Sequence, residues 1–100
     1  MNLYTVRFDE RATRQLEGID DWIASNGSPR AAESFIDAIL DECASLGVYP
    51  HRGHRRDDIL PGLRTLGFRR RVVIVFSVQA DTVAILGIFY GGQDYESTLR

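Results

Sequence analysis

Residues 63–90 read LRTLGFRRRVVIVFSVQADTVAILGIFY, and this stretch decides the fold. It contains three runs rich in β-branched and aromatic residues, at 63–68, 71–78 and 82–90, a composition that is typical of β-strands. The segments between the runs are short, and short connections join neighbouring strands that run in opposite directions. The stretch therefore predicts a three-stranded antiparallel meander.

The segment before the meander predicts one strand and two helices. Residues 3–8 alternate between apolar and polar side chains, as a strand does. Asp9 can cap a helix whose apolar residues follow helical spacing and which ends before residues 26–27. A Ser-Pro pair at 28–29 begins a second amphipathic helix, which ends at Gly47. The predicted fold class is α+β, in the order β-α-α-β-β-β, with a helical hairpin packed on an antiparallel sheet.

The last two predicted strands are apolar on both faces. An antiparallel sheet with one face in water should alternate polar and apolar residues, and two helices cover only one face. In the last strand, strict alternation sets Val83, Ile85 and Phe89 against Ala84, Leu86, Ile88 and Tyr90. We therefore expect a partner chain to cover part of the second face.

Length and composition bound the class of protein. One hundred residues, 44% hydrophobic and 26% charged, are those of one ordinary globular domain over residues 1–100. The longest apolar run, 83–90, is too short to span a bilayer, and no signal-like leader is recognisable, so we expect a cytoplasmic protein without membrane contact. The lone cysteine, Cys43, falls on a predicted apolar helix stripe and is expected to be buried and inert.

The net charge of -2 hides a strong segregation. Residues 51–71 hold seven arginines against two aspartates, whereas residues 1–50 hold four arginines against nine carboxylates. All twelve basic residues are arginine, whose planar guanidinium suits carboxylates, phosphates and aromatic faces. The basic segment therefore favours an anionic partner of a class that charge alone does not specify.

The long polar loop at 51–62 contains the candidate chemical groups, and such loops often carry function. His51 and His54, followed by Asp57 and Asp58, are potential metal ligands, but no cysteine partner or helical HExxH frame accompanies them. We therefore predict no metal site. No glycine-rich loop with cofactor spacing occurs, so no cofactor is predicted.

Acid–base cleavage of RNA is the enzymatic alternative. Arg64 and the arginines at 69–71 could hold a scissile phosphate, and Tyr90 or Tyr95 could move a proton or stack on a base. Tyrosine is a poor base near neutral pH, and no lysine is available to assist it. The same arginines could equally rim the end of the sheet.

The order of these elements resembles the RelE/ParE superfamily of bacterial toxins, and most closely its ParE branch. The resemblance rests on several short motifs in the same order. They are Ala31-Ala32-x-x-Phe35, Pro61-Gly62-Leu63-Arg64, Val73-Ile74-Val75-Phe76 and Gly91-Gly92-Gln93-Asp94. The resemblance implies that the chain is the toxin of a type II toxin–antitoxin module and is held inactive by a cognate antitoxin. The antitoxin is expected to be a small acidic DNA-binding protein, through which the pair contacts operator DNA.

The resemblance also implies a target. ParE toxins are associated with poisoning DNA gyrase, whereas RelE toxins cut messenger RNA on the ribosome with a set of lysines, arginines and a tyrosine. The absence of lysine favours gyrase binding over RNA cleavage. An inactive homologue that serves only in operon autoregulation is a third possibility.

The chain departs from the ParE pattern near its C-terminal end. Gly87 stands where an arginine tends to occur, Tyr90 replaces a histidine, and Gln93 stands beside Asp94. We predict that no residue is catalytic and that the partner-binding residues are Arg52, Arg55, Arg56, Arg64, Arg69, Arg70, Arg71, Tyr90, Gln93 and Asp94. Arg56 is expected at the exposed rim of this surface and Arg64 in a partly buried position.

Overall fold

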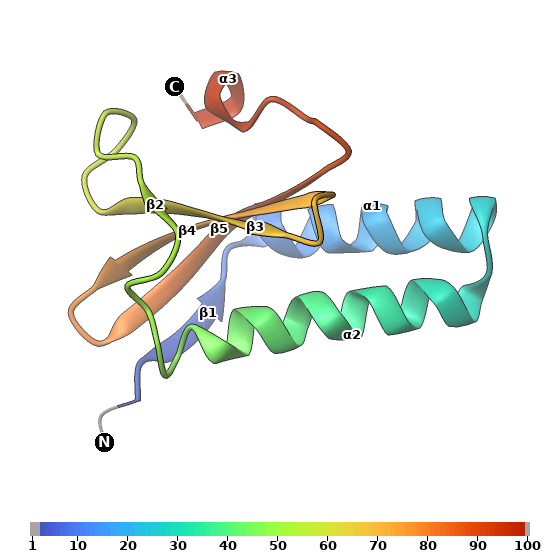
Figure 1. Ribbon diagram of the computed structural model, residues 1–100, viewed down its shortest axis with the longest axis horizontal. Coiled ribbons are helices and arrows are strands. Elements are labelled where there is room, and N and C mark those ends of the chain that lie inside the picture. Colours follow the sequence, from blue (N-terminus) through green and yellow to red (C-terminus); the bar gives the residue numbers. More distant parts are fainter. Residues whose placement is uncertain (1–2, 100) are drawn as a thin grey trace.

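The computed structural model describes residues 3–99, and Figure 1 shows two long helices on one side of a twisted sheet and a short helix on the other. The elements in chain order are β1 (Thr5–Phe8), α1 (Glu10–Asn26), α2 (Pro29–Ser45), β2 (His54–Arg55), β3 (Leu63–Phe68), β4 (Val72–Gln79), β5 (Thr82–Tyr90) and α3 (Tyr95–Leu99). The predicted α+β class, the helical hairpin and the three-stranded meander are confirmed.

Both long helices begin at the predicted caps. The Asp9 carboxylate accepts a hydrogen bond from the Arg11 N–H at 3.3 Å, and the Ser28 hydroxyl accepts one from the Ala31 N–H at 3.0 Å. These bonds satisfy N–H groups that have no partner within the first turn of a helix. The helix α1 includes Asn26, one residue beyond its expected end.

The sheet is mixed rather than purely antiparallel, which corrects the prediction. Its strand order is β1-β5-β4-β3-β2, and β1 pairs with β5 in parallel. The helical hairpin returns the chain to the end of the sheet where β1 starts. There the Tyr4 N–H donates to the Gly47 carbonyl at 2.8 Å. The first strand of the meander, β3, therefore runs in the same direction as β1. The second strand, β4, runs in the opposite direction, and the third, β5, is again parallel to β1. The predicted loop at 51–62 also contains the two-residue strand β2.

A β-bulge in β5 corrects the predicted division of its side chains between the two faces. Val75 pairs with Gly87 and Phe76 with Ile85, so one extra residue enters β5. The alternation therefore shifts: Ile88 joins Val83 and Ile85 on the helix-covered face, and Phe89 lies on the other. Single-sequence alternation cannot foresee such an insertion.

The core has two layers, one on each face of the sheet. The larger packs both long helices against the sheet through residues that include Leu16, Ile39, Ile74, Phe76 and Ile85. The smaller, on the opposite face, consists of Leu63, Val75 and Phe89 with Ile59, Val73, Leu86, Tyr95 and Leu99 around it. The chain itself thus supplies cover for the second face, from α3 and the loop before β3, where a partner chain was expected.

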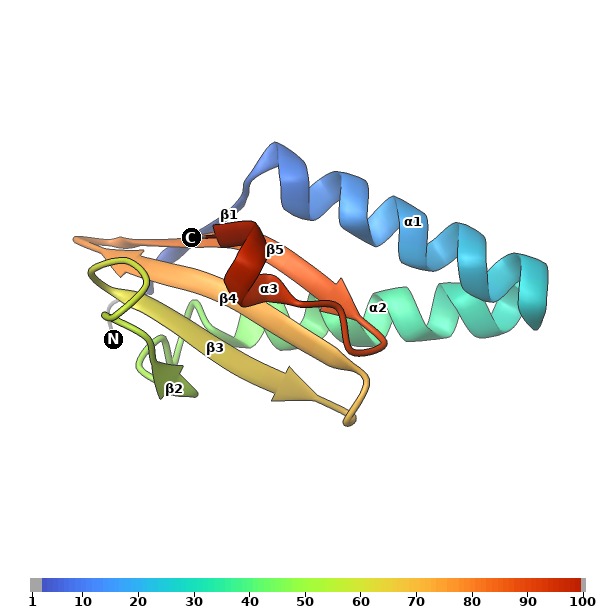
Figure 2. The ribbon, with the colours of Figure 1, turned by 90° about the horizontal axis from the view of Figure 1, so that it is seen from above.

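The helix α3 folds back over the sheet after β5, as the view in Figure 2 shows. Gly91 and Gly92 have φ of 68° and 83°, left-handed values that side chains rarely adopt. The Gly91 N–H donates to the Arg71 carbonyl at 2.9 Å, and the Gln93 side chain accepts from the Tyr90 N–H at 2.8 Å. The turn therefore fixes where α3 lies.

Candidate functional site

The seven predicted partner-binding arginines lie in separate places, and two of them are paired in the loop after α2. Arg52 Nη2 lies 3.4 Å from Glu42 Oε1, and Arg55 Nη2 lies 2.9 Å from Asp57 Oδ2. The pKa of Asp57 is held below its ordinary value, first because the Gly62 N–H donates to its carboxylate. These pairs neutralise both arginines within the chain.

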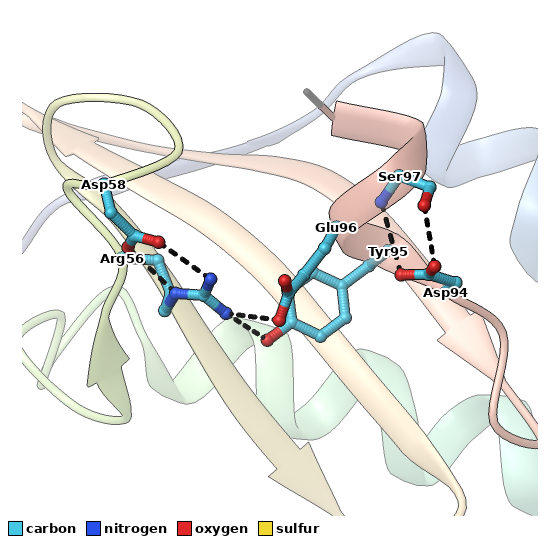
Figure 3. A network of polar contacts seen from close by, with 6 residues as sticks. All are labelled: Arg56, Asp58, Asp94, Tyr95, Glu96 and Ser97. Carbon is cyan, nitrogen blue, oxygen red and sulfur yellow. Dashed lines mark hydrogen bonds and ion pairs between the residues drawn. The ribbon is translucent and has the colours of Figure 1, made fainter.

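Arg56 is the centre of a polar network that joins the loop before β3 to α3 (Figure 3). Its Nε and Nη2 donate to the two carboxylate oxygens of Asp58, each at 2.9 Å. Its Nη1 donates to the Tyr95 hydroxyl and to Glu96 Oε1, also at 2.9 Å. Two-point arginine–carboxylate pairs of this kind are strong and fix orientation. We call Arg56, Asp58, Tyr95 and Glu96 the C-terminal clasp.

The prediction that Arg56 lies at an exposed rim is wrong. Its side chain is 21% exposed, and the bonds to Asp58 and Glu96 raise its pKa above the ordinary arginine value. Arg64 is partly buried, as predicted, and its Nη1 donates to the Arg52 carbonyl at 3.3 Å. The error arises because Glu96 lies forty positions along the chain from Arg56, beyond the reach of local patterns.

Asp94 caps α3 within the chain. Its carboxylate accepts from the Ser97 hydroxyl at 2.7 Å and from the Ser97 N–H at 3.2 Å. These bonds hold the pKa of Asp94 below its ordinary value, the hydroxyl contributing most. Asp94 therefore supports the position of α3 in this structure.

Three of the remaining predicted residues, Arg71, Tyr90 and Gln93, meet where β4 begins and β5 ends. Two adjoining hollows of about 310 and 520 Å³ share the walls Trp22, Arg71 and Tyr90. Phe35 lines the smaller hollow and Gln93 the larger. We call this surface the end groove. The structure thus brings Arg71, Tyr90 and Gln93 together, whereas Asp94, also predicted to bind a partner, does not line either hollow.

Aromatic packing shapes the end groove. The Trp22 and Tyr90 ring centroids lie 5.8 Å apart at 55°, and Phe35 meets Tyr90 edge-on at 6.0 Å. Trp22 is nevertheless 56% exposed. The sequence analysis did not include Trp22 or Phe35 in the site. The available signal was the position of Trp22 beside the apolar stripe of α1 rather than on it.

Arg69 and Arg70 form the tight turn between β3 and β4, beside the end groove. Both have positive φ, of 50° and 59°, in a conformation for which glycine and asparagine are preferred. The Arg69 guanidinium carbon lies 5.1 Å from the centre of the Phe68 ring, a cation–π contact. The turn therefore presents two exposed arginines next to Arg71.

The other candidate groups are not assembled into a site. Within residues 3–99, no group of three His, Cys, Asp or Glu side chains is placed to hold a metal ion. His51 contacts the Tyr4 ring edge-on at 6.2 Å. Burial raises the pKa of the Cys43 thiol to about 12, which keeps it protonated and unreactive. No described helix is long and apolar enough to cross a membrane.

The helical hairpin packed on a mixed sheet is the arrangement of the RelE/ParE toxin fold. A family model described as the ParE toxin of the type II toxin–antitoxin system parDE matches residues 6–95. Because the match covers most of the sequence, the chain belongs to the ParE toxin family. A search of curated protein sequences found no match.

Solved structures agree with this fold. The chain is similar to a chain of the chromosomal ParDE toxin–antitoxin system from P. aeruginosa, with TM-score 0.77, 23% identity, and cover of 89% of this chain and 97% of that one. It is also similar to a chain of the toxin–antitoxin complex RelBE2 from Mycobacterium tuberculosis, with TM-score 0.64, 24% identity, and cover of 93% and 97%. At these identities the likeness establishes the fold alone.

Proposed function

We propose that this ParE-family toxin arrests growth in the cytoplasm by binding and poisoning DNA gyrase. In the proposal, a cognate antitoxin, a small acidic DNA-binding protein, neutralises the toxin and carries it to operator DNA. The toxin acts as a binding inhibitor and not as a catalyst.

The division of the basic residues is the observation that carries the proposal. Arg64 lies near the start of β3, beside Arg52, whereas Arg71 lies next to Tyr90 beyond the other end of that strand. A strand rises about 3.3 Å per residue, so the ends of a six-residue strand are roughly 17 Å apart. One scissile phosphate cannot contact both ends. Two arginines as far apart as Arg64 and Arg71 suit the gripping of a large partner better.

A second candidate function, RNA cleavage of the RelE type, has one observation in its favour. Arg71 and Tyr90 line the same hollow, where a phosphate and a proton-transferring hydroxyl could meet. The other tyrosine considered for this role, Tyr95, has its hydroxyl bonded by Arg56 in the C-terminal clasp. The nuclease candidate therefore depends on Tyr90 for proton transfer and on Arg71, with the neighbouring Arg69 and Arg70, for holding a phosphate.

Induction in a growing culture, followed over time, separates these functions. We expect growth arrest with DNA damage signalling, while primer extension shows intact messages, and we expect the purified chain to block DNA supercoiling by gyrase. The variant Tyr90→Phe keeps the ring and removes only the hydroxyl, so it should stay toxic. Codon-dependent message cuts that precede DNA damage and vanish in Tyr90→Phe would establish the nuclease instead. An absence of growth arrest would leave operon autoregulation as the function.

A further inference from the structure

The turn between β3 and β4 places arginines on a strained backbone. Arg69 and Arg70 are the two central residues of the turn at 68–71, in which the Arg71 N–H donates to the Phe68 carbonyl at 3.1 Å. Both have positive φ, and turns of this kind prefer asparagine followed by glycine. Arginine therefore strains the turn without helping it to form. Strained residues cluster where side chains have a function. We call residues 68–71 the arginine turn.

The charges of the arginine turn are not neutralised within the chain. Arg69, Arg70 and Arg71 are exposed, and none of them forms an ion pair with a carboxylate of residues 3–99. No described Asp or Glu lines the two hollows that Arg71 borders. Arg56, by contrast, is bonded to two carboxylates of its own chain. The three guanidinium groups of the arginine turn are thus available to an anion from outside.

The arginine turn is held in place by the ends of its two strands. Phe68 pairs with Val72, and the Gly91 N–H donates to the Arg71 carbonyl at 2.9 Å. The Arg69 guanidinium carbon lies 5.1 Å from the centre of the Phe68 ring, which restrains that side chain. Groups that are already positioned lose less freedom on binding. Figure 2 shows the turn at the margin of the molecule, clear of α1 and α3.

The shape and the charge of the arginine turn suit a phosphate backbone. Duplex DNA carries about one negative charge for every 1.7 Å of its axis, so it repeats its charge at short intervals. Three consecutive arginines repeat theirs in the same way, and each planar guanidinium can bond two phosphate oxygens at once. A convex turn reaches such a backbone from outside. It offers no hollow of its own for a peptide side chain.

We propose that the arginine turn contacts the phosphate backbone of duplex DNA. This inference rests on the proposed function for its setting, in which the duplex is the DNA that gyrase holds. The toxin then grips the DNA of its target as well as the protein. The contact has no sequence preference, because phosphates are the same at every base pair. The net charge of -2 opposes strong binding to DNA alone, so the turn adds to a grip that contacts with gyrase begin.

A second copy of this chain fits the arginine turn less well. The hollow between the two long helices is lined by Asp20, Glu33 and Asp37, and these carboxylates could attract the turn of another copy. Turn and hollow are different surfaces, so such a contact joins copies head to tail. Head-to-tail contacts build rings or open filaments instead of closed pairs. We therefore treat self-association as an outcome that the experiment must detect.

The double variant Arg69→Asn with Arg70→Gly separates recognition from folding. It installs the asparagine–glycine pair that the turn geometry prefers, so the midpoint of urea unfolding, followed by circular dichroism, should rise. The same variant removes two of the three guanidinium groups, so DNA binding should fall. A defect in folding cannot produce both results.

The salt dependence of DNA binding counts the contacts. A short blunt duplex is titrated into the chain, and amide shifts of the arginine turn are followed by NMR at several salt concentrations. Each neutralised phosphate contributes about -0.9 to the slope of log K against log salt, so three contacts predict a slope of about -2.7. Binding should then weaken roughly fortyfold between about 50 and 200 mM salt. In the double variant, one remaining contact predicts a slope of about -0.9.

Arg7→Gln with Arg11→Gln is the matched control. It removes the same charge from two exposed arginines that form no ion pair within residues 3–99. Arg7 pairs with Ala84 in the first half of β5, whereas the arginine turn lies beside the end of that strand. The control should keep the slope of the parent chain. A second duplex of unrelated sequence should bind equally well.

Several results would overturn the inference. Equal slopes in the two double variants would mean that net charge, and not the arginine turn, governs binding. A glutamate-rich peptide that shifts the turn amides as strongly as the duplex would assign the turn to carboxylates. Tighter binding of a single-stranded oligonucleotide would assign it to unpaired strands. Turn amide shifts that depend on protein concentration without DNA would assign it to a second copy.

The inference and the proposed function fail in different ways. If the chain binds the duplex as expected but does not block supercoiling, gyrase poisoning is wrong and the DNA contact stands. If it blocks supercoiling, we expect that about tenfold more of Arg69→Asn with Arg70→Gly is needed, the effect of losing one good contact. Equal potency of the variant and the parent chain would remove the DNA contact and leave gyrase poisoning. A loss confined to operator repression would overturn the assignment to gyrase-held DNA.

Discussion

Arg56 and Arg71 belong to the same basic segment, yet they lie in opposite environments. Arg56 is bonded to two carboxylates and a tyrosine of its own chain and holds α3 on the sheet. Arg71 forms no ion pair within the described residues and borders an open aromatic groove. An arginine with satisfied donors contributes to structure, whereas one left beside exposed apolar surface is available for recognition.

The C-terminal clasp and the end groove should therefore respond differently to substitution. The clasp region contains Phe89, which is 4% exposed and packs against Tyr95 at 6.1 Å. The groove contains Trp22, which is 56% exposed. Changes on the clasp side should lower stability, and changes on the groove side should lower binding.

The largest difference is expected between Phe89→Ala and Trp22→Ala. Removing the buried Phe89 ring should lower the free energy of unfolding by about 3–5 kcal/mol. Removing the half-exposed Trp22 should lower it by only about 1 kcal/mol, the packing of one aromatic pair. Urea unfolding followed by circular dichroism measures both. Similar losses in the two variants would show that the end groove is part of the structural core.

A smaller, local effect is expected for Arg56→Gln. Without the guanidinium, Glu96 and Asp58 lose a shared cation, so α3 should detach from the sheet more often than in the parent chain. Hydrogen exchange at the Ser97 amide should accelerate, while that of the core strands changes little. Slow labelling of the buried Cys43 thiol reports independently that the main core stays closed.

Arg55→Gln is the matched control for Arg56→Gln. Arg55 also pairs with an aspartate two residues away, but its side chain is 71% exposed and does not reach α3. Exposed pairs of this kind contribute little to stability. Faster Ser97 exchange in Arg55→Gln than in Arg56→Gln would mean that loop order as a whole, and not the Arg56 network, holds α3.

The sequence predicted the elements of the fold because each has a local signal. The caps at Asp9 and Ser28 and the β-branched runs after residue 63 are read from adjacent residues. The parallel pairing of β1 with β5 and the bulge near Gly87 depend on contacts between distant segments. Beside the bulge, the Gln15 side chain of α1 accepts from the Ile88 N–H at 2.7 Å, and no local pattern indicates that bond.

Residues predicted to bind a partner lie together in the structure where they are close in the sequence. Tyr90 and Gln93 follow one another along the chain and line the end groove together, with Arg71. Trp22 and Phe35 reach it from the helical hairpin, and the hairpin's docking angle is set by core packing. The arginine count alone could not separate Arg56, which is bonded to Tyr95 and Glu96 of α3, from Arg71, which lines the open end groove.

The smallest expected effect concerns pH and the Asp94 cap of α3. The pKa of Asp94 is lower in the folded chain than in the unfolded one, because the charged form accepts from the Ser97 hydroxyl and N–H. The contribution of Asp94 to the stability of α3 is therefore complete at neutral pH and is lost as the pH falls through the lowered pKa, below the usual aspartate value of about 3.9.

The chemical shift of the Ser97 amide, followed by NMR during acid titration, should report this loss. The variant Asp94→Asn removes this carboxylate and is compared with the parent chain. The comparison isolates the cap: Asp94→Asn should weaken α3 already at neutral pH and respond less to acid. Identical titration curves in the two proteins would show that the clasp alone holds α3, and that the Asp94 carboxylate is available to a partner instead.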